Sequence, residues 1–327
     1  MIVFCHYGDA PYLRHTLAAA RRTNPDRAVV LLGDGANEAT AARAGVRHAP
    51  FERYAYGEDW ETFDRVFRPV QGRLHRQHRG GRDWLRFVFE RWFFVRNLAE
   101  SEGAAPFWHF DSDVLITLAL AQFEGALAGV DCTAQCNGGC LNGYVAGPGV
   151  AASYVRHINA LFERPAYLAA QQREFDEVNP SYAFTEMRAY EAWREETGVA
   201  VRPLTAPISG TAFDDGLCFS AGYETERLRS GQEVKRVHLG ESGSFWCRHE
   251  ASGRWDRLGA LNFSWVPSYL VGFAADHLAS AAPAARLPGP PPREGRTLGS
   301  VPVPFAERPQ DWWIRAKGAV NRAIGRA

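Results

Sequence analysis

Two aspartates, Asp111 and Asp113, are the residues in this sequence whose type and spacing are best suited to chemistry. They follow the apolar, aromatic run FWHF, and only Ser112 separates them. Residues i and i+2 of a strand point the same way, so the two carboxylates would converge if the chain stays extended. Adjacent carboxylates repel each other, and a divalent cation, Mg²⁺ or Mn²⁺ for oxygen ligands, removes that conflict. The triplet therefore predicts a metal site that could bridge the two phosphates of a nucleotide.

The elements around this triplet predict an α/β domain. Short apolar runs indicate buried strands, and helical spacing indicates helices between them: strands at 1–5, 28–32, 46–48 and 106–110, and helices at 11–22, 36–44 and 83–100. Alternation of strand and helix is typical of a mainly parallel sheet. Such sheets bind ligands at the carboxyl ends of their strands, which is where Asp111 is expected to lie. Asp83 is predicted to be the N-cap of the helix at 83–100.

The rest of the chain is expected to be less regular. The pattern predicts a glycine-rich loop, two helices, a second loop, a hairpin and a further strand: 138–149, 150–162, 184–197, 208–222, 234–249 and 254–262. We expect residues 1–280 to form the main domain. The proline-rich residues 281–310 are expected to be a linker or strap, and residues 311–327 an amphipathic helix.

Composition excludes some classes of protein. Lys+Arg and Asp+Glu are both 37, for a net charge of +0, so we expect no nucleic-acid partner. The first residues lack a signal-peptide pattern, and no stretch reaches the roughly 18 apolar residues of a membrane span, which predicts a cytoplasmic protein. The tryptophans and basic residues of the last helix leave two interpretations open. The helix either docks on the domain or makes peripheral contact with the inner face of a membrane.

The order of these features resembles the GT-A glycosyltransferases, and most of all bacterial enzymes that build surface polysaccharides. The resemblance rests on the first strand, the Gly-Asp after the second strand, the segments FERWFFVRNL and FDSDVLI, and the glycine-rich segment, over residues 1–276. It implies a GT-A, Rossmann-like α/β fold with a mixed, mainly parallel sheet, flanking helices and a C-terminal extension. It also implies transfer of a sugar, a hexose as first choice, from a nucleotide-diphosphate donor. A UDP-sugar is the first choice of donor, with Mn²⁺ or Mg²⁺ as cofactor and a saccharide or lipid-linked acceptor.

The resemblance also assigns donor-binding residues. Asp111, Ser112 and Asp113 would hold the metal and the diphosphate, and Arg91 would face the donor. The remaining residues would frame the nucleobase, the ribose and the sugar: Cys5, His6, Tyr7, Asp34, Asn142 and Gly143. Glycine at position 143 would allow the backbone to approach a sugar closely.

Catalysis by inversion would need a carboxylate base, whereas a retaining enzyme would need none. Glu186 is the first candidate, and its alternative role is that of a first-turn glutamate favoured by the helix dipole. Asp214 and Asp215 are the second candidates, and their alternative is a solvated, flexible loop.

The predicted metal site departs from the family at its third ligand. Many GT-A enzymes supply a late histidine, but the segment LGALNFSWVPSYL has Asn262 at that place. Asn262 could coordinate weakly through its carbonyl oxygen. His238 and His249 are the alternative ligands.

Two other functions stay open. A phosphatase of the haloacid dehalogenase type also carries Asp-x-Asp after a strand, but normally near the start of its domain. A catalytically inactive GT-A-fold protein that only binds sugar is the second alternative, and the departure at Asn262 keeps it open.

Overall fold

The computed structural model describes residues 1–75, 81–280 and 295–302 and is built around a seven-stranded sheet. The strands follow the order β3-β2-β1-β4-β7-β6-β8. Their bounds are β1 (Ile2–His6), β2 (Val29–Gly33), β3 (Arg47–Pro50), β4 (Phe107–Asp111), β6 (Cys132–Gln135), β7 (Cys140–Val145) and β8 (Val201–Pro203). The first four strands pair in parallel, β7 is antiparallel to both its neighbours, and β8 is parallel to β6. This confirms the predicted α/β class with a mixed, mainly parallel sheet.

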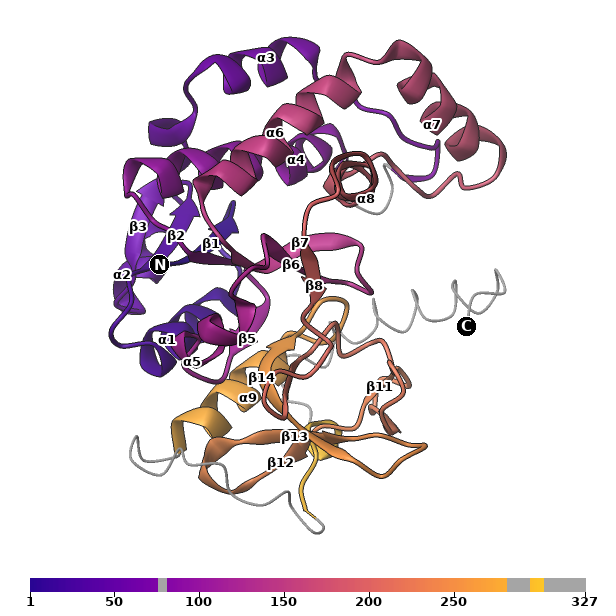
Figure 1. Ribbon diagram of the computed structural model, residues 1–327. Coiled ribbons are helices and arrows are strands. Elements are labelled where there is room, and N and C mark those ends of the chain that lie inside the picture. Colours follow the sequence, from indigo (N-terminus) through magenta and orange to yellow (C-terminus); the bar gives the residue numbers. More distant parts are fainter. Residues whose placement is uncertain (76–80, 281–294, 303–327) are drawn as a thin grey trace.

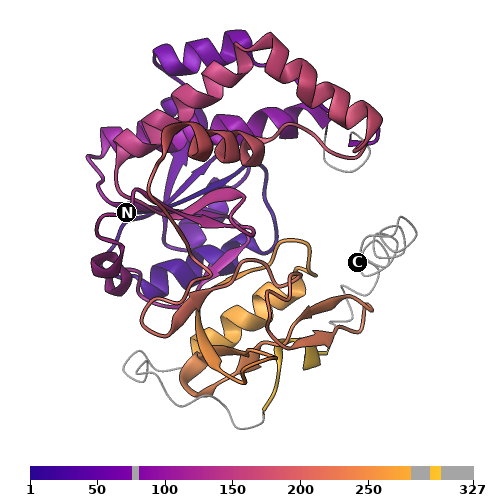
Figure 2. The ribbon, with the colours of Figure 1, turned by 45° about the vertical axis from the view of Figure 1, so that its right-hand side comes forward.

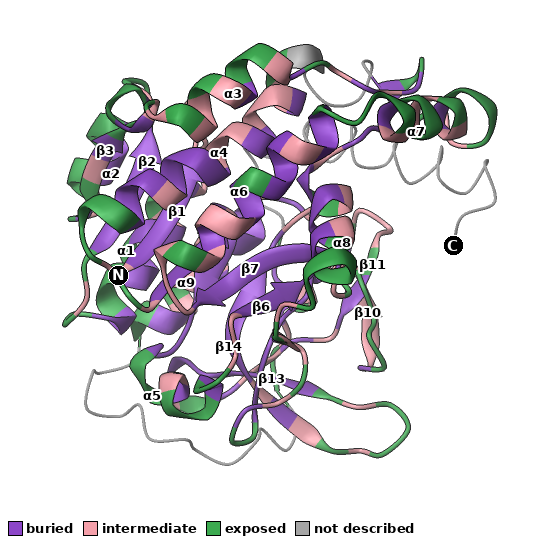
Figure 3. Ribbon diagram, turned by 45° about the horizontal axis from the view of Figure 1, so that its top comes forward, coloured by how far each residue is buried: buried purple, intermediate pink, exposed green. Residues whose placement is uncertain are grey.

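Helices cover both faces of this sheet, as a parallel sheet requires. Val3 and Cys5 of β1 belong to one hydrophobic cluster, and Ile2 and Phe4 belong to another. The first face is covered by α3 (Glu58–Val66), α4 (Gly81–Ser101), α6 (Pro148–Phe162), α7 (Pro165–Glu177) and α8 (Glu186–Thr197). The other is covered by α1 (Leu13–Thr23), α2 (Glu38–Arg43) and α5 (Ala121–Glu124) (Figure 1). The central strands are buried, while the outer side of α7 is exposed (Figure 3).

A second, mainly antiparallel sheet follows in the C-terminal part of the chain. It comprises β5 (Val114–Ile116), β9 (Thr211–Phe213), β12 (His238–Leu239), β13 (Phe245–Arg248) and β14 (Trp255–Asn262), beside a separate hairpin of β10 (Thr225–Arg227) and β11 (Glu233–Lys235). Helix α9 (Tyr269–Ser280) packs between this sheet and α1 (Figure 2). Strand β14 pairs with β5, with Asn262 opposite Val114. The late part of the sequence is therefore held beside the residue that follows Asp113.

The prediction of a glycine-rich loop at residues 138–149 is wrong for the middle of that segment. Residues 140–145 form β7, a fully buried strand between β4 and β6. Gly143 lies there with φ of 92°, and a Cβ would sit 2.3 Å from Leu204 and 2.6 Å from Thr133. Glycine at this position is required by its backbone conformation and by packing inside the sheet.

Other boundaries differ less. Helix α4 begins at Gly81, so Asp83 lies in its first turn and is not the cap. Helices α5, α7 and α9 were not predicted, and β9 interrupts the expected loop at 208–222. The strand predicted at 234–239 is divided into β11, which pairs with β10, and β12, which pairs antiparallel with β13 of the second predicted strand.

Only part of the C-terminal extension is described. Residues 296–298 lie along β12, where Leu239 N–H donates to Arg296 and Leu298 N–H donates to Val237. Leu298 is buried there, which is how a strap would pack. The rest of the proline-rich segment and the predicted helix at 311–327 lie outside the described residues. Among the residues that the structure describes, no helix is both long and apolar enough to cross a membrane.

Replacing Phe63 with alanine is expected to lower the free energy of unfolding by about 3–5 kcal/mol. This ring is 0% exposed and packs against Phe67, Phe93 and Phe162, so its removal leaves a cavity between α3, α4 and α6. Urea denaturation measures the change. Tyr56→Ala is the control, because Tyr56 is 46% exposed and its loss should stay within about 0.5 kcal/mol. Equal stability of the two variants would contradict this packing.

Candidate functional site

The parallel pairing of β1 and β4 brings the ends of both strands together. Cys5 pairs with Asp111, so the next residues, His6 and Ser112, are neighbours. His6 Nδ1 lies 2.9 Å from Ser112 Oγ, and the Tyr12 hydroxyl lies 3.3 Å from the same atom. The predicted proximity of His6 to the acidic triplet is therefore present at the carboxyl edge of the sheet.

Arg91 of α4 bridges two carboxylates from distant parts of the chain. Its guanidinium donates to Asp111 Oδ1 at 2.5 Å and to Glu186 Oε1 at 2.8 Å. The side chains are 12%, 27% and 10% exposed for Arg91, Asp111 and Glu186. Arg91 was expected to face a donor, but both terminal nitrogens of its guanidinium contact carboxylates. The sequence prediction placed Arg91 and Glu186 at the site without showing that they bind each other.

This bridge gives the two carboxylates different pKa values. Burial would raise the pKa of Asp111, but the charge of Arg91, the charge of His109 and the hydrogen bond from Arg91 together hold it below its ordinary value. The pKa of Glu186 is raised, because burial exceeds the opposing effect of Arg91. Glu186 is also the first residue of α8, where the helix dipole favours a negative charge.

Asp113 lies in the turn between β4 and β5, and its charge is less well compensated than that of Asp111. Its Oδ2 accepts the Ser264 hydroxyl at 2.9 Å, while Oδ1 is buried and has no hydrogen-bond partner in the described structure. Burial, followed by the charge of Asp111, raises the pKa of Asp113 to about 6. A buried carboxylate oxygen without a partner, beside a second carboxylate, fits a divalent cation. The described residues hold no cluster of three acidic, histidine or cysteine side chains suited to a metal.

The late segment reaches Asp113 through Ser264. Asn262 Oδ1 accepts the Ser264 backbone N–H at 2.9 Å, and Asn262 Nδ2 is buried without a partner. Nothing in the geometry supports Asn262 as a direct metal ligand. Of the alternative ligands, His249 has its Nε2 2.9 Å from Asp256. The His238 ring packs on Trp255 in β12, and both its nitrogens lack a hydrogen-bond partner among the described residues.

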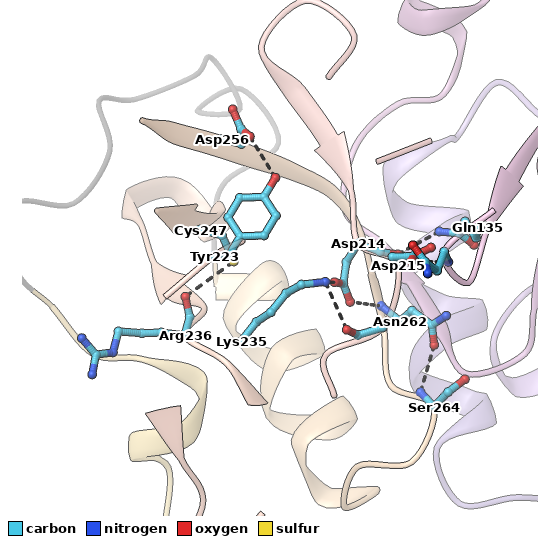
Figure 4. Close-up of polar contacts among 12 residues, drawn as sticks. Gln135, Asp214, Asp215, Tyr223, Lys235, Arg236, Cys247, Asp256, Asn262 and Ser264 are labelled. Atoms are coloured by element: carbon cyan, nitrogen blue, oxygen red, sulfur yellow. Dashed lines mark hydrogen bonds and ion pairs between the residues drawn. The ribbon is translucent and has the colours of Figure 1, made fainter. Parts of the chain in front are cut away.

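The expectation of a flexible, solvated loop at Asp214 and Asp215 is wrong, because each is 3% exposed. Asp214 Oδ1 accepts from Lys235 Nζ at 2.6 Å, and Oδ2 accepts the Asn262 backbone N–H at 2.9 Å (Figure 4). Asp215 Oδ2 accepts the backbone N–H of Asn137, while Oδ1 is buried without a partner. Burial raises the pKa of Asp215. Asp214 is thus fully engaged, whereas Asp215 keeps one oxygen for a ligand.

Several buried polar atoms near this edge lack partners within the described part of the chain. Gln135, the last residue of β6, donates to the Asp214 carbonyl at 2.9 Å, but its Oε1 accepts nothing. The set comprises Asp113 Oδ1, Gln135 Oε1, Asn142 Oδ1 and Nδ2, Asp215 Oδ1 and Asn262 Nδ2. Buried polar groups are nearly always hydrogen-bonded in folded proteins. Unpartnered buried atoms also occur elsewhere among the described residues, such as both ring nitrogens of His238, so the group at this edge marks polar atoms that a ligand could complete.

The remaining predicted donor residues, Asp34, Tyr7 and Cys5, differ in their surroundings. Asp34 accepts the backbone N–H of Gly8 at 2.7 Å and of Ala36 at 3.0 Å, so its carboxylate closes the turns after β1 and β2. Tyr7 is 45% exposed and lies edge-on to Phe87. The prediction for Cys5 is wrong in one respect, because its side chain is 4% exposed in the hydrophobic core and cannot frame a base.

Three residues of this region were missed by the sequence analysis. Gln135 and Ser264 carry no local signal, because their roles depend on pairing between strands. Lys235 does carry one, since Lys235 and Lys317 are the only lysines in a chain with 37 basic residues.

Comparisons with known proteins give low similarity. No family model matches the sequence, and no curated protein sequence matches it. One similar solved structure is mouse xyloside xylosyltransferase 1 in its apo form, with 9% identity, a TM-score of 0.39, and coverage of 62% of this chain and 84% of that chain. Another is an active-site mutant of LgtC, with 13% identity, a TM-score of 0.43, and coverage of 94% of this chain and 98% of that chain. These values leave the function to be decided by the chemistry of the site.

Replacing Arg91 with methionine is expected to lower the free energy of unfolding by about 3–5 kcal/mol, because two buried carboxylates lose their counter-ion. The double variant Arg91→Met/Glu186→Gln should lose less, since one of those charges is also removed. Calorimetry or urea denaturation measures both.

Arg96→Met is the matched control one turn further along α4. It pairs with Asp59 and Glu100 at 3.9 and 3.3 Å and donates to the Asn97 side chain at 2.7 Å, so the loss should be smaller than for Arg91→Met, about 1 kcal/mol. A double variant less stable than Arg91→Met would contradict the bridge.

Proposed function

We propose that this chain is a glycosyltransferase that moves a sugar from a nucleotide-diphosphate donor, a UDP-sugar as first choice, to a saccharide or lipid-linked acceptor. One observation carries the proposal. The acidic pair at the carboxyl edge of the sheet is accompanied by buried carboxyl and amide atoms that have no partner. An acidic pair suits a metal and diphosphate, and convergent amide and carboxyl groups suit the hydroxyls of a sugar.

For the diphosphate, Asp111 and Asp113 would hold Mn²⁺ or Mg²⁺, and the fit rests on the unpartnered Oδ1 of Asp113. When bound, the ion would neutralise the charge that develops on the leaving nucleoside diphosphate. The protein itself keeps Asp111 ionised through Arg91 and orients Asp113 through the Ser264 hydroxyl. His6 and Ser112, hydrogen-bonded to each other, would border the phosphates.

For the sugar, Gln135, Asp215 and Asn262 offer an amide oxygen, a carboxylate oxygen and an amide N–H that have no hydrogen-bond partner in the part of the chain that the structure describes. A carboxylate with a raised pKa is suited to accept a proton at neutral pH. Asp215 is therefore our candidate for the carboxylate that faces the reacting sugar. Asp214 is held in an ion pair, and Glu186 is held by Arg91, so both are assigned to positioning.

The nucleobase would lie beyond the ends of β1 and β2. Tyr7 offers an exposed ring there, and Asp34 fixes the two turns that would surround a base or ribose. A cytoplasmic location, and contact of residues 311–327 with the membrane, stay predictions from the sequence.

The two alternative functions are less well supported by the geometry. A haloacid dehalogenase-type phosphatase carries its acidic pair after an early strand, whereas here the pair follows β4. An inactive sugar-binding protein would retain the polar groups but would not need a carboxylate oxygen of raised pKa at Asp215.

A nucleotide screen tests the donor site. Thermal unfolding with UDP, GDP, CMP or TDP, each with and without Mn²⁺, should show stabilisation by one nucleotide that depends on the metal. At a hundredfold excess over the dissociation constant the gain is about 2.7 kcal/mol. Asp113→Asn should remove the metal dependence and leave the fold intact. The absence of any shift at millimolar nucleotide would rule out the donor site.

Asp215→Asn is expected to slow the hydrolysis or transfer of the sugar by at least about 100-fold while nucleotide binding is retained. The substitution keeps the size of the side chain and the bond to the Asn137 N–H but removes the carboxylate charge. Release of nucleoside diphosphate from nucleotide sugars measures the rate. Release of phosphate from p-nitrophenyl phosphate instead would favour the phosphatase.

A further inference from the structure

Lys235 is buried where a lysine is costly. Its side chain is 2% exposed, and Nζ donates to Asp214 Oδ1 at 2.6 Å and to the Gly216 carbonyl at 3.1 Å. The chain has only two lysines, Lys235 and Lys317, and its other 35 basic residues are arginines. Lys235 lies in the interior. A buried ion pair often adds little net stability compared with apolar residues of the same volume, so stability alone is a weak reason for it.

A continuous series of hydrogen bonds runs from this pair to Asp113, and Figure 4 shows it as far as Ser264. Asp214 Oδ2 accepts the Asn262 backbone N–H at 2.9 Å, and Asn262 Oδ1 accepts the Ser264 backbone N–H at 2.9 Å. The Ser264 hydroxyl then donates to Asp113 Oδ2 at 2.9 Å. Each member of the series fixes the next, and the last bond holds one oxygen of Asp113.

We propose that the Lys235–Asp214 pair positions Asp113 through the turn of residues 262–264. The proposal rests on the proposed function, because it assigns Asp113 to the metal and diphosphate of the donor. Asp214 is held on one side by Lys235 Nζ and binds the end of β14 with its other oxygen. The turn is thereby held in the position in which the Ser264 hydroxyl reaches Asp113.

This arrangement gives the late segment a role at the site although it has Asn262 where a histidine was expected. The segment contributes a hydroxyl that occupies Oδ2 of Asp113, and Oδ1 is left without a protein partner. Partners of a metal-binding carboxylate orient it, and their loss typically lowers metal affinity by about 10–100-fold. Lys235 and Asp214 are therefore positioning residues, as are Asn262 and Ser264.

Manganese affinity of the protein without nucleotide tests the proposal, measured by electron paramagnetic resonance of free Mn²⁺. Ser264→Ala removes the last bond and changes no charged residue, and it should weaken Mn²⁺ binding by about 10–100-fold. Ser264→Thr keeps the hydroxyl and should restore the affinity. Lys235→Met/Asp214→Asn removes both charges together and should weaken binding to a similar degree. Adding Ser264→Ala to that variant should cause little further loss, because the residues act in series.

Ser244→Ala is the matched control, because Ser244 is also a buried, hydrogen-bonded serine but lies outside the series. It should leave Mn²⁺ affinity unchanged. Wild-type affinity in folded Ser264→Ala and in the double variant would overturn the proposal.

Hydrogen exchange provides a readout that needs no metal. The amides of residues 262–264 should exchange at least tenfold faster in Lys235→Met/Asp214→Asn than in the wild type, while those of β1 should not change. If the wild type binds no Mn²⁺, the metal assignment of the proposed function fails, and exchange alone decides the positioning role. Unchanged exchange in that turn would overturn it.

Discussion

The bridge from Arg91 to Asp111 and Glu186 is the interaction on which the arrangement of the site depends. It joins α4, β4 and α8, and it places one positive charge between two carboxylates that are otherwise buried together. Removing one partner of such a group is costly, because the remaining charge stays in a poorly solvated place. The bridge therefore fixes the positions of α4 and α8 relative to the end of β4. Asp113 lies outside the bridge, and one of its carboxylate oxygens is buried with no partner among the described residues.

The difference between the two aspartates follows from the course of the chain. Asp111 ends β4 and faces the helical side, where Arg91 meets it, whereas Asp113 lies in the turn that leads into β5. Because β5 pairs with β14, the surroundings of Asp113 come from residues about 150 positions later, such as Ser264. Two residues of one short motif thus have different neighbours, and their pKa values move in opposite directions for that reason.

Local patterns predicted the parts of this structure that local physics determines. Apolar runs predicted β1, β2 and β4, and the position of Asp111 at a strand end followed from them. The requirement for glycine at 143 could not be predicted, because it comes from Leu204 and Thr133 on neighbouring segments.

The burial of Asp214 could not be predicted for the same kind of reason. Its partner Lys235 lies 21 residues later, and the contact exists only once β9, β11 and β14 have assembled. Acidic residues next to glycine are usually solvated, so the sequence pattern favoured the wrong interpretation. The scarcity of lysine was a usable signal, because one of only two lysines among 37 basic residues marks a place that takes a compact ammonium group.

The unpartnered polar atoms impose a cost that the rest of the fold must offset. Each buried donor or acceptor without a partner costs about 1–3 kcal/mol, which is large beside the net stability of a domain. The aromatic cluster of α3, α4 and α6 on the other side of Arg91 buries many rings, including Phe63, Phe89 and Phe162. Burial of that apolar surface stabilises the helical face, so the sheet edge can keep polar groups unsatisfied. A ligand that pairs with those groups would then gain the free energy that the folded chain leaves unused, and the site would bind polar molecules because the protein alone does not satisfy it.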